Sequence, residues 1–193
     1  MSIATAKRFT VAEYHRLSDL GFFKEDDRFE LIHGEIIQIA AKGKAHAVSN
    51  TRLIRELIKL IGERATVRSQ EPIILPADSE PEPDIAIVCN RPDDYLSAHP
   101  SPEDVLLLIE IADTSLSYDR NTKLALYAEA GIFDYWVLNL VENCLECYSE
   151  PYQSGQGSYG YRLKRILLPA ETIALPPFPD LSLLLARVFP GDN

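Results

Sequence analysis

The feature that most constrains this chain is the run VLLLIEI (residues 105–111), which is apolar except for Glu110. A short continuous run of branched apolar residues is typical of a β-strand that is buried on both faces of a sheet. An ionised carboxylate in such a strand costs several kcal/mol unless a cation or hydrogen-bond donors accompany it. We therefore expect Glu110 to hold a partner inside the fold.

The rest of the chain alternates between helix-like and strand-like segments. Helices are predicted at residues 10–17, about 45–62 and about 119–130. The first begins with a capping box of Thr10 and Glu13, and the last ends before Gly131, as expected of a C-cap residue. A hairpin is predicted on either side of His33-Gly34. Further strands are predicted at residues 66–76, 84–89, 105–113, 133–140, 144–150 and 161–168, and a turn at LPPFPD before a final short apolar element.

This order predicts a mixed α/β (α+β) domain with a central mixed β-sheet flanked by helices, and with an N-terminal helix and β-hairpin. The length of 193 residues suits one domain over residues 1–193. No apolar run approaches the roughly 18 residues needed to span a bilayer, so no membrane partner is expected. The N-terminus lacks the apolar block of a secretory signal, and three cysteines are an odd number for a disulfide framework. We therefore expect a cytoplasmic protein.

The formal net charge of −10 argues against a protein that coats nucleic acid through a broad basic surface. One segment differs, because it holds seven basic residues and two acidic ones, Glu56 and Glu63. The basic residues are Lys42, Lys44, Arg52, Arg55, Lys59, Arg64 and Arg68. This segment suits one phosphate-facing side, for which we expect Arg52, Arg55 and Lys59 to contact nucleic acid; a solvated helix face is the alternative interpretation.

Three polar residues lie where the predicted elements meet. Asp84 precedes an apolar strand, Glu110 lies inside the next strand, and Lys123 is in the helix that follows. Two adjacent strands can bring Asp84 and Glu110 together, and a divalent cation stabilises two neighbouring carboxylates in their ionised form. We expect Asp84, Glu110 and a backbone carbonyl near Ile111 to hold Mg²⁺ or Mn²⁺, with Lys123 beside it.

An alternative interpretation is a buried ion network that needs no metal. In it Glu110 pairs with an arginine, Asp84 caps a turn after Pro83, and Lys123 is solvent-exposed with Asp119 one helical turn away. The spacing of these residues alone leaves both interpretations open.

The segments around these residues resemble a known family. EPDIAIV followed by IEIAD is similar to the PD-(D/E)XK nuclease superfamily, and nearly the full chain resembles the restriction-endonuclease-like proteins of the Uma-two family. Six segments carry the resemblance in order: FTVAEYHRL, DDRFELIHGEII, HAVSNTRLIRELI, EPDIAIV, IEIADTSLSYDRNTKLALYAEAGIFDYWVLN and FPDLSL. The resemblance implies a restriction-endonuclease-like core.

The resemblance also implies roles for particular residues. Asp84 and Glu110 would be the metal-binding acids, and Glu30 a further acid, with a cross-strand ion pair as its alternative role. The superfamily expects a lysine two residues after the glutamate, where this chain has Ala112, and the family's lysine on the following helix matches Lys123.

Two further expectations follow. His46 matches a family histidine, for which we expect a helix-terminal or core-packed role. Tyr127, on the predicted helix at residues 119–130, is expected to fill the core between helix and sheet.

The function expected from these observations is that of a metal-dependent endodeoxyribonuclease, which hydrolyses phosphodiester bonds of DNA with Mg²⁺ or Mn²⁺. The alternative is a noncatalytic DNA-binding or assembly module that keeps the nuclease fold, which Ala112 favours. Cutting both strands of a duplex is easier for a two-fold dimer, so a homodimer is one expectation.

Overall fold

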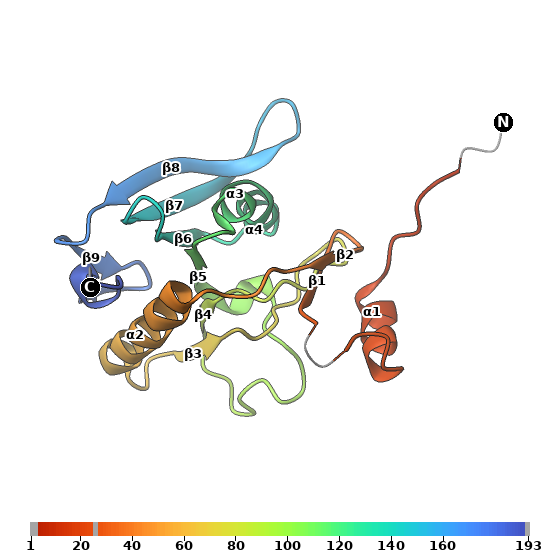
Figure 1. Cartoon of the computed structure of the whole chain (residues 1–193), viewed down its shortest axis with the longest axis horizontal. Helices are drawn as coiled ribbons and strands as arrows, with labels where there is room; N and C mark the ends of the chain where they lie inside the picture. The colour runs from red at the N-terminus through yellow and green to blue at the C-terminus, as the bar shows by residue number, and fades with distance from the viewer. Residues whose placement is uncertain (1–3, 25–26, 192–193) are drawn as a thin grey trace.

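A computed structural model describes residues 4–24 and 27–191 of the chain. The domain predicted over residues 1–193 also includes residues 1–3, 25–26 and 192–193, which lie outside the described residues. Six strands form the central sheet, in the order β3-β4-β5-β6-β7-β8 (Figure 1). They are β3 (Thr66–Ser69), β4 (Ile85–Val88), β5 (Val105–Ala112), β6 (Asp134–Asn139), β7 (Cys144–Gln153) and β8 (Tyr159–Leu167). Only β5 and β6 pair in parallel, so the sheet is mixed as predicted.

Both faces of the sheet are covered. On one face, Leu107, Ile109 and Ile111 of β5 belong to a core with the long helix α2 (Lys44–Ile61). On the other face, Leu108 and Ala112 belong to a core with the helix that follows β5. Figure 1 shows these helices on opposite sides of the sheet. The burial of β5 on both faces confirms the prediction from its apolar run.

The helix after β5 is continuous but irregular. It consists of α3 (Leu116–Tyr118), the π-helical turn η2 (Asp119–Lys123) and α4 (Leu124–Glu129), and so begins before the predicted start at residue 119. Asp119, Lys123 and Tyr127 are all buried, at intervals of four residues. Residues four apart lie on one face of a helix, so this face carries polar groups towards the sheet.

An N-terminal layer lies to one side of the sheet (Figure 1). Helix α1 (Val11–Asp19) has the predicted capping box of Thr10 and Glu13, and β1 (Phe29–Ile32) pairs with β2 (Glu35–Gln38) as the predicted hairpin. At the turn, Gly34 has φ of 74°, and an added Cβ would lie 2.9 Å from the Phe9 carbonyl oxygen. Only glycine suits this position, because the conformation is left-handed and the chain passes close by.

Two further sequence predictions differ from the structure. The strand predicted over residues 66–76 ends at Ser69, because Gln70 has φ of 57° and so turns the chain out of the extended conformation. The final apolar element is the second strand of a hairpin, and the short strand before it was not predicted. This hairpin pairs β9 (Thr172–Leu175) with β10 (Phe178–Leu184) and is followed by η3 (Leu185–Arg187). Elsewhere in the chain, the short helix η1 (Pro102–Asp104) precedes β5. No helix in the described part of the chain is long and apolar enough to cross a membrane.

Candidate active site

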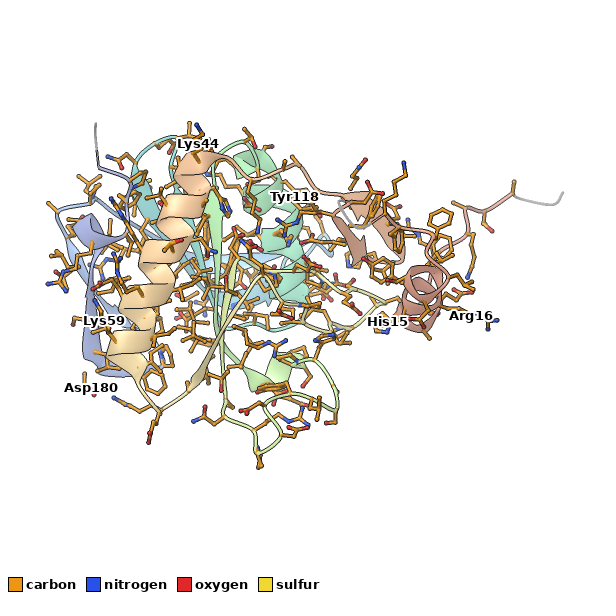
Figure 2. All side chains as sticks on the ribbon, turned by 60° about the horizontal axis from the view of Figure 1, so that its bottom comes forward. His15, Arg16, Lys44, Lys59, Tyr118 and Asp180 are labelled. Atoms are coloured by element: carbon orange, nitrogen blue, oxygen red, sulfur yellow. The ribbon has the colours of Figure 1, made fainter. Side chains whose placement is uncertain are left out.

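A pocket of about 70 Å³ opens where β4 and β5 meet the N-terminal hairpin and the start of α2. In the view of Figure 2, Tyr118 lies between the start of α2, marked by Lys44, and helix α1, which carries His15 and Arg16. Acidic and basic side chains share the pocket wall. The charged side chains that line it are those of Arg28, Glu30, Lys42, Glu82, Asp84, Glu110, Asp113, Asp119 and Lys123, together with His46. This volume suits a few water molecules or a small hydrated ion rather than a nucleotide.

The register of the sheet brings the two predicted acids together. Ile85 of β4 lies opposite Ile109 of β5, so Asp84 lies opposite Glu110 one step further along this antiparallel pair. Side chains directly opposite each other on antiparallel strands point to the same face. The backbone N–H of Asp84 donates to Glu110 Oε2 at 3.1 Å.

Three groups contact the carboxylate of Asp84. Its Oδ2 atom accepts the N–H of Ile111 at 2.9 Å and lies 2.8 Å from His46 Nε2. Its Oδ1 atom accepts from Lys42 Nζ at 2.5 Å. Burial would raise the pKa of Asp84, but the hydrogen bond from His46 and the charge of Lys42 outweigh burial and lower the pKa to about 2. Asp84 is therefore ionised at neutral pH.

Lys123 joins two of the acids inside the fold. Its Nζ atom donates to Glu30 Oε1 at 2.7 Å and to Glu110 Oε1 at 3.2 Å, and the side chain is 3% exposed. The Tyr127 hydroxyl also donates to Glu110 Oε1, at 2.7 Å. Burial lowers the pKa of Lys123, but the charges of Glu110 and Glu30 outweigh it and raise the pKa above its ordinary value. Lys123 therefore remains a cation.

Burial acts differently on the remaining acids. It raises the pKa of Glu110, against the lowering effect of the Lys123 charge. It also raises the pKa of Asp119 to about 6, although the Ser115 hydroxyl donates to Asp119 Oδ2 at 2.6 Å. A divalent cation nearby would favour the ionised form of both carboxyls.

Three polar atoms on the pocket wall are buried without a hydrogen-bond partner among the described residues. They are Glu30 Oε2, His46 Nδ1 and the Tyr118 hydroxyl. Buried polar atoms are normally satisfied, so these three atoms are available to a ligand that enters the pocket. Carboxylate oxygens are the ligands that Mg²⁺ and Mn²⁺ prefer, so the donor set fits such an ion.

The carboxylate oxygens of Glu30, Asp84 and Glu110 nevertheless do not form a compact set of ligands. In the described part of the chain, three potential ligand atoms within 4.8 Å of one another occur only at Glu142, Cys144 and Glu146, away from this pocket. The oxygens of Glu30, Asp84 and Glu110 are more widely spread. Lys123 lies between two of these acids, and Lys42 lies against the third.

The buried ion network of the alternative interpretation is present, but the partners predicted for its members are wrong. Glu110 pairs with Lys123 rather than with an arginine, and Lys123 is buried rather than exposed. The Asp84 side chain accepts from Ile111 on the neighbouring strand instead of capping a turn. Ile111 contacts Asp84 through its N–H, whereas a backbone carbonyl near Ile111 was expected to bind the metal.

Several contacts in the pocket were not predicted. His46 is buried as expected of a core-packed residue, but it also hydrogen-bonds Asp84. Tyr127 fills the core as predicted, and its hydroxyl in addition reaches Glu110. The position of Tyr127, four residues after Lys123, was a signal that could have indicated this contact. Nothing in the sequence around Lys42 indicated its pairing with Asp84.

The basic residues of α2 have mixed surroundings. Arg52 donates to the carbonyl of Phe189 and so helps to hold the C-terminal segment. Arg55 and Lys59 are exposed and lie 3.8 Å and 3.3 Å from Glu56 Oε1. Figure 2 shows Lys44 and Lys59 at opposite ends of the helix.

Comparisons with known proteins agree with this fold. The sequence profile of the Uma2 family, described as "Putative restriction endonuclease", matches residues 11–186. A solved structure described as "a putative nuclease belonging to DUF820", from Anabaena variabilis ATCC 29413, has a TM-score of 0.73 and 16% sequence identity, over 94% of this chain and 97% of that chain. This likeness shows the fold, and no curated protein sequence matches the chain. The family match supports a nuclease-like function. Because the profile spans most of its length, the chain belongs to the Uma2 family of putative restriction endonucleases.

Proposed function

We propose that the protein is a divalent-metal-dependent endonuclease that hydrolyses phosphodiester bonds of DNA. The observation that carries this proposal is the register that sets Asp84 opposite Glu110, with Lys123 against Glu110 in the same pocket. Restriction-endonuclease-like proteins generally use divalent metals, and their family implies DNA as substrate.

Each residue of the pocket would have a distinct role. Asp84, Glu110 and the unpaired Oε2 of Glu30 would hold Mg²⁺ or Mn²⁺. The metal, when bound, would lower the pKa of a water molecule and polarise the phosphate. Lys123 would orient the attacking water or stabilise negative charge on the phosphate oxygens in the transition state. His46 would fix the carboxylate of Asp84 through their hydrogen bond.

The nucleic acid would approach along the pocket mouth and α2. Arg55 and Lys59 are exposed on this helix and would contact phosphates. Arg52 is a weaker candidate, because its guanidinium already donates to the carbonyl of Phe189.

The proposal is tested with supercoiled plasmid and purified protein in the presence of Mg²⁺ or Mn²⁺. We expect the wild type to nick the plasmid and Asp84→Asn or Glu110→Gln to lower the rate by more than about 100-fold, because each removes a metal ligand. Glu82→Gln is the matched control. Glu82 lines the same pocket but pairs with Arg28 at 3.4 Å, so this variant should keep nearly the wild-type rate.

A noncatalytic DNA-binding module is the second candidate, and the enclosure of Lys123 between two carboxylates favours it. It predicts DNA binding by the wild type with no nicking above the level of Asp84→Asn with either metal. That result would reject catalysis and would leave DNA binding as the function of the protein.

A further inference from the structure

We propose that Lys42 occupies the cation position beside Asp84 in the metal-free protein and, once displaced by the metal, binds a phosphate of the nucleic acid. This inference rests on the proposed metal-dependent function. It assigns to Lys42 two successive anionic partners, a carboxylate and then a phosphodiester.

The first step of the argument concerns the open positions on Asp84. Its Oδ2 atom already has two partners, His46 Nε2 at 2.8 Å and the N–H of Ile111 at 2.9 Å. Its Oδ1 atom has one partner among the described residues, the ammonium of Lys42 at 2.5 Å. A carboxylate oxygen accepts along about two lone-pair directions, so a metal ion reaching Asp84 must approach Oδ1. There it meets the positive charge of Lys42.

The second step compares the two lysines of the pocket. Lys123 is 3% exposed and hydrogen-bonds to Glu30, Glu110 and Tyr127, so removing it would leave several buried groups without a partner. Lys42 is 18% exposed and, within the described residues, its side chain hydrogen-bonds to Asp84 alone. It also lies outside regular structure, between β2 and α2. Lys42 is therefore the lysine that can leave its carboxylate at small cost.

The third step concerns the position of the Lys42 ammonium after it leaves Asp84. Lys42 lines the pocket and is partly exposed, and its four-carbon stem lets the ammonium turn without moving the backbone. A metal at Asp84 repels the ammonium, whereas a phosphate held by that metal attracts it. The displaced Lys42 therefore adds a phosphate contact next to the bond that is cut.

The test compares Lys42→Met with Lys44→Met, using Mn²⁺ alone as the probe. Lys44 carries the same charge two residues further along, is exposed and makes no recorded ion pair in the part of the chain that the structure describes. We expect Lys42→Met to tighten Mn²⁺ binding by roughly tenfold, because a competing unit charge is gone, and to show a larger Mn²⁺-dependent rise in melting temperature. Lys44→Met and Lys42→Arg, which keeps the charge, should bind Mn²⁺ like the wild type.

The nucleic-acid half of the proposal is measured with duplex DNA in Ca²⁺. Lys42→Met should bind DNA more weakly than the wild type, with a log–log salt slope smaller by about 0.9, as for one lost phosphate contact. Opposite changes in metal and DNA affinity would support the proposal, because a misfolded variant would bind both ligands more weakly. Lys42→Gln provides a second neutral variant if Lys42→Met is unstable.

The outcomes separate this inference from the proposed function. Mn²⁺ binding that Asp84→Asn abolishes but Lys42→Met leaves unchanged overturns the role of Lys42 and keeps the metal site. An unchanged salt slope overturns the phosphate contact. Absence of Mn²⁺ binding in both wild type and Lys42→Met overturns both proposals, whereas tighter binding in Lys42→Met without any nicking supports the inference and rejects only catalysis.

Discussion

At the scale of single residues, the question raised by Glu110 has a structural answer. Its carboxylate lies in a strand buried on both faces, and three donors compensate for the lost hydration: Lys123, the Tyr127 hydroxyl and the backbone N–H of Asp84. Replacing a buried ion pair by apolar residues of similar volume is often neutral or stabilising, so a buried ionic network is weak evidence for stability. The network is therefore better explained by a requirement of the site than by stability.

A first prediction at this scale concerns the Tyr127 hydroxyl. Tyr127→Phe keeps the ring, which packs edge-on against Tyr135 at 5.0 Å between centroids, but leaves Glu110 Oε1 with one donor fewer. Because hydrogen bonds to a ligating carboxylate fix its orientation, we expect Mn²⁺ affinity to fall by about 10 to 100-fold. Isothermal titration with Mn²⁺ measures the change.

The matched control is Tyr135→Phe. Tyr135 is equally buried, and its hydroxyl donates to the backbone carbonyl of Asp119 at 3.1 Å instead of to an acid of the site. This variant should lose about 1 kcal/mol of stability and keep wild-type Mn²⁺ affinity. Equal Mn²⁺ affinities in the two variants would show that the Tyr127 hydroxyl has only a structural role.

The site residues differ in how far the sequence could predict them. Asp84 and Glu110 stand out because acids next to or inside apolar strands are costly, and the strand order then brings them together. Lys42 and the hydrogen bond of His46 could not be predicted, because they depend on how the segment before α2 folds over the end of the sheet. Contacts between segments far apart in sequence leave no local pattern.

At the scale of elements, the π-helical turn η2 determines how the helix after β5 faces the sheet. π-helical turns are rare and occur often at functional sites, because they change the direction of side chains within a helix. Here Lys123 points into the pocket, while Arg120 of the same turn pairs with Glu146 of β7. The sequence predicted a helix over this segment, but a π-helical turn has no composition signal and was not predicted.

Helix α2 carries the second prediction. If its exposed basic residues contact phosphates, the double variant Arg55→Ala/Lys59→Ala should bind duplex DNA more weakly, with a log–log salt slope smaller by up to about 1.8. Fluorescence anisotropy at several salt concentrations measures both quantities. Arg162→Ala is a suitable control, since Arg162 is exposed on β8 and pairs with Glu150 of the neighbouring strand β7. A wild-type slope in the double variant would assign these residues to a solvated helix face.

At the scale of the whole molecule, the sheet and the helix after β5 are joined by a second buried ionic network, centred on Glu146. Its fully buried carboxylate accepts hydrogen bonds from Arg120, Asn139 and Tyr148. It also forms an ion pair with Lys164 at 2.8 Å. Because Arg120 lies in the same turn as Lys123, this network also fixes the turn that carries the lysine of the candidate site. The overall alternation of helices and strands was predictable from apolar periodicity, whereas this network, like Lys42, required the three-dimensional arrangement.

The last prediction follows from the ionisation of Glu146. Burial would raise its pKa, but hydrogen bonds from Arg120, Lys164 and Tyr148 outweigh burial and lower the pKa from 4.5 to about 2. Between these two values the unfolded chain binds more protons than the folded protein, so the stabilisation is fully present above about pH 4.5 and is lost as the pH falls towards 2.

Glu146→Gln should therefore destabilise the protein by about 3 kcal/mol at pH 7, with a difference from wild type that shrinks steadily below pH 4.5. Urea unfolding of both proteins from pH 7 to pH 3 measures this difference. Glu150→Gln is the control, because Glu150 lies on the same strand and its side chain is 38% exposed. A difference between wild type and Glu146→Gln that stays constant over this range would mean that Glu146 contributes through packing rather than through its charge.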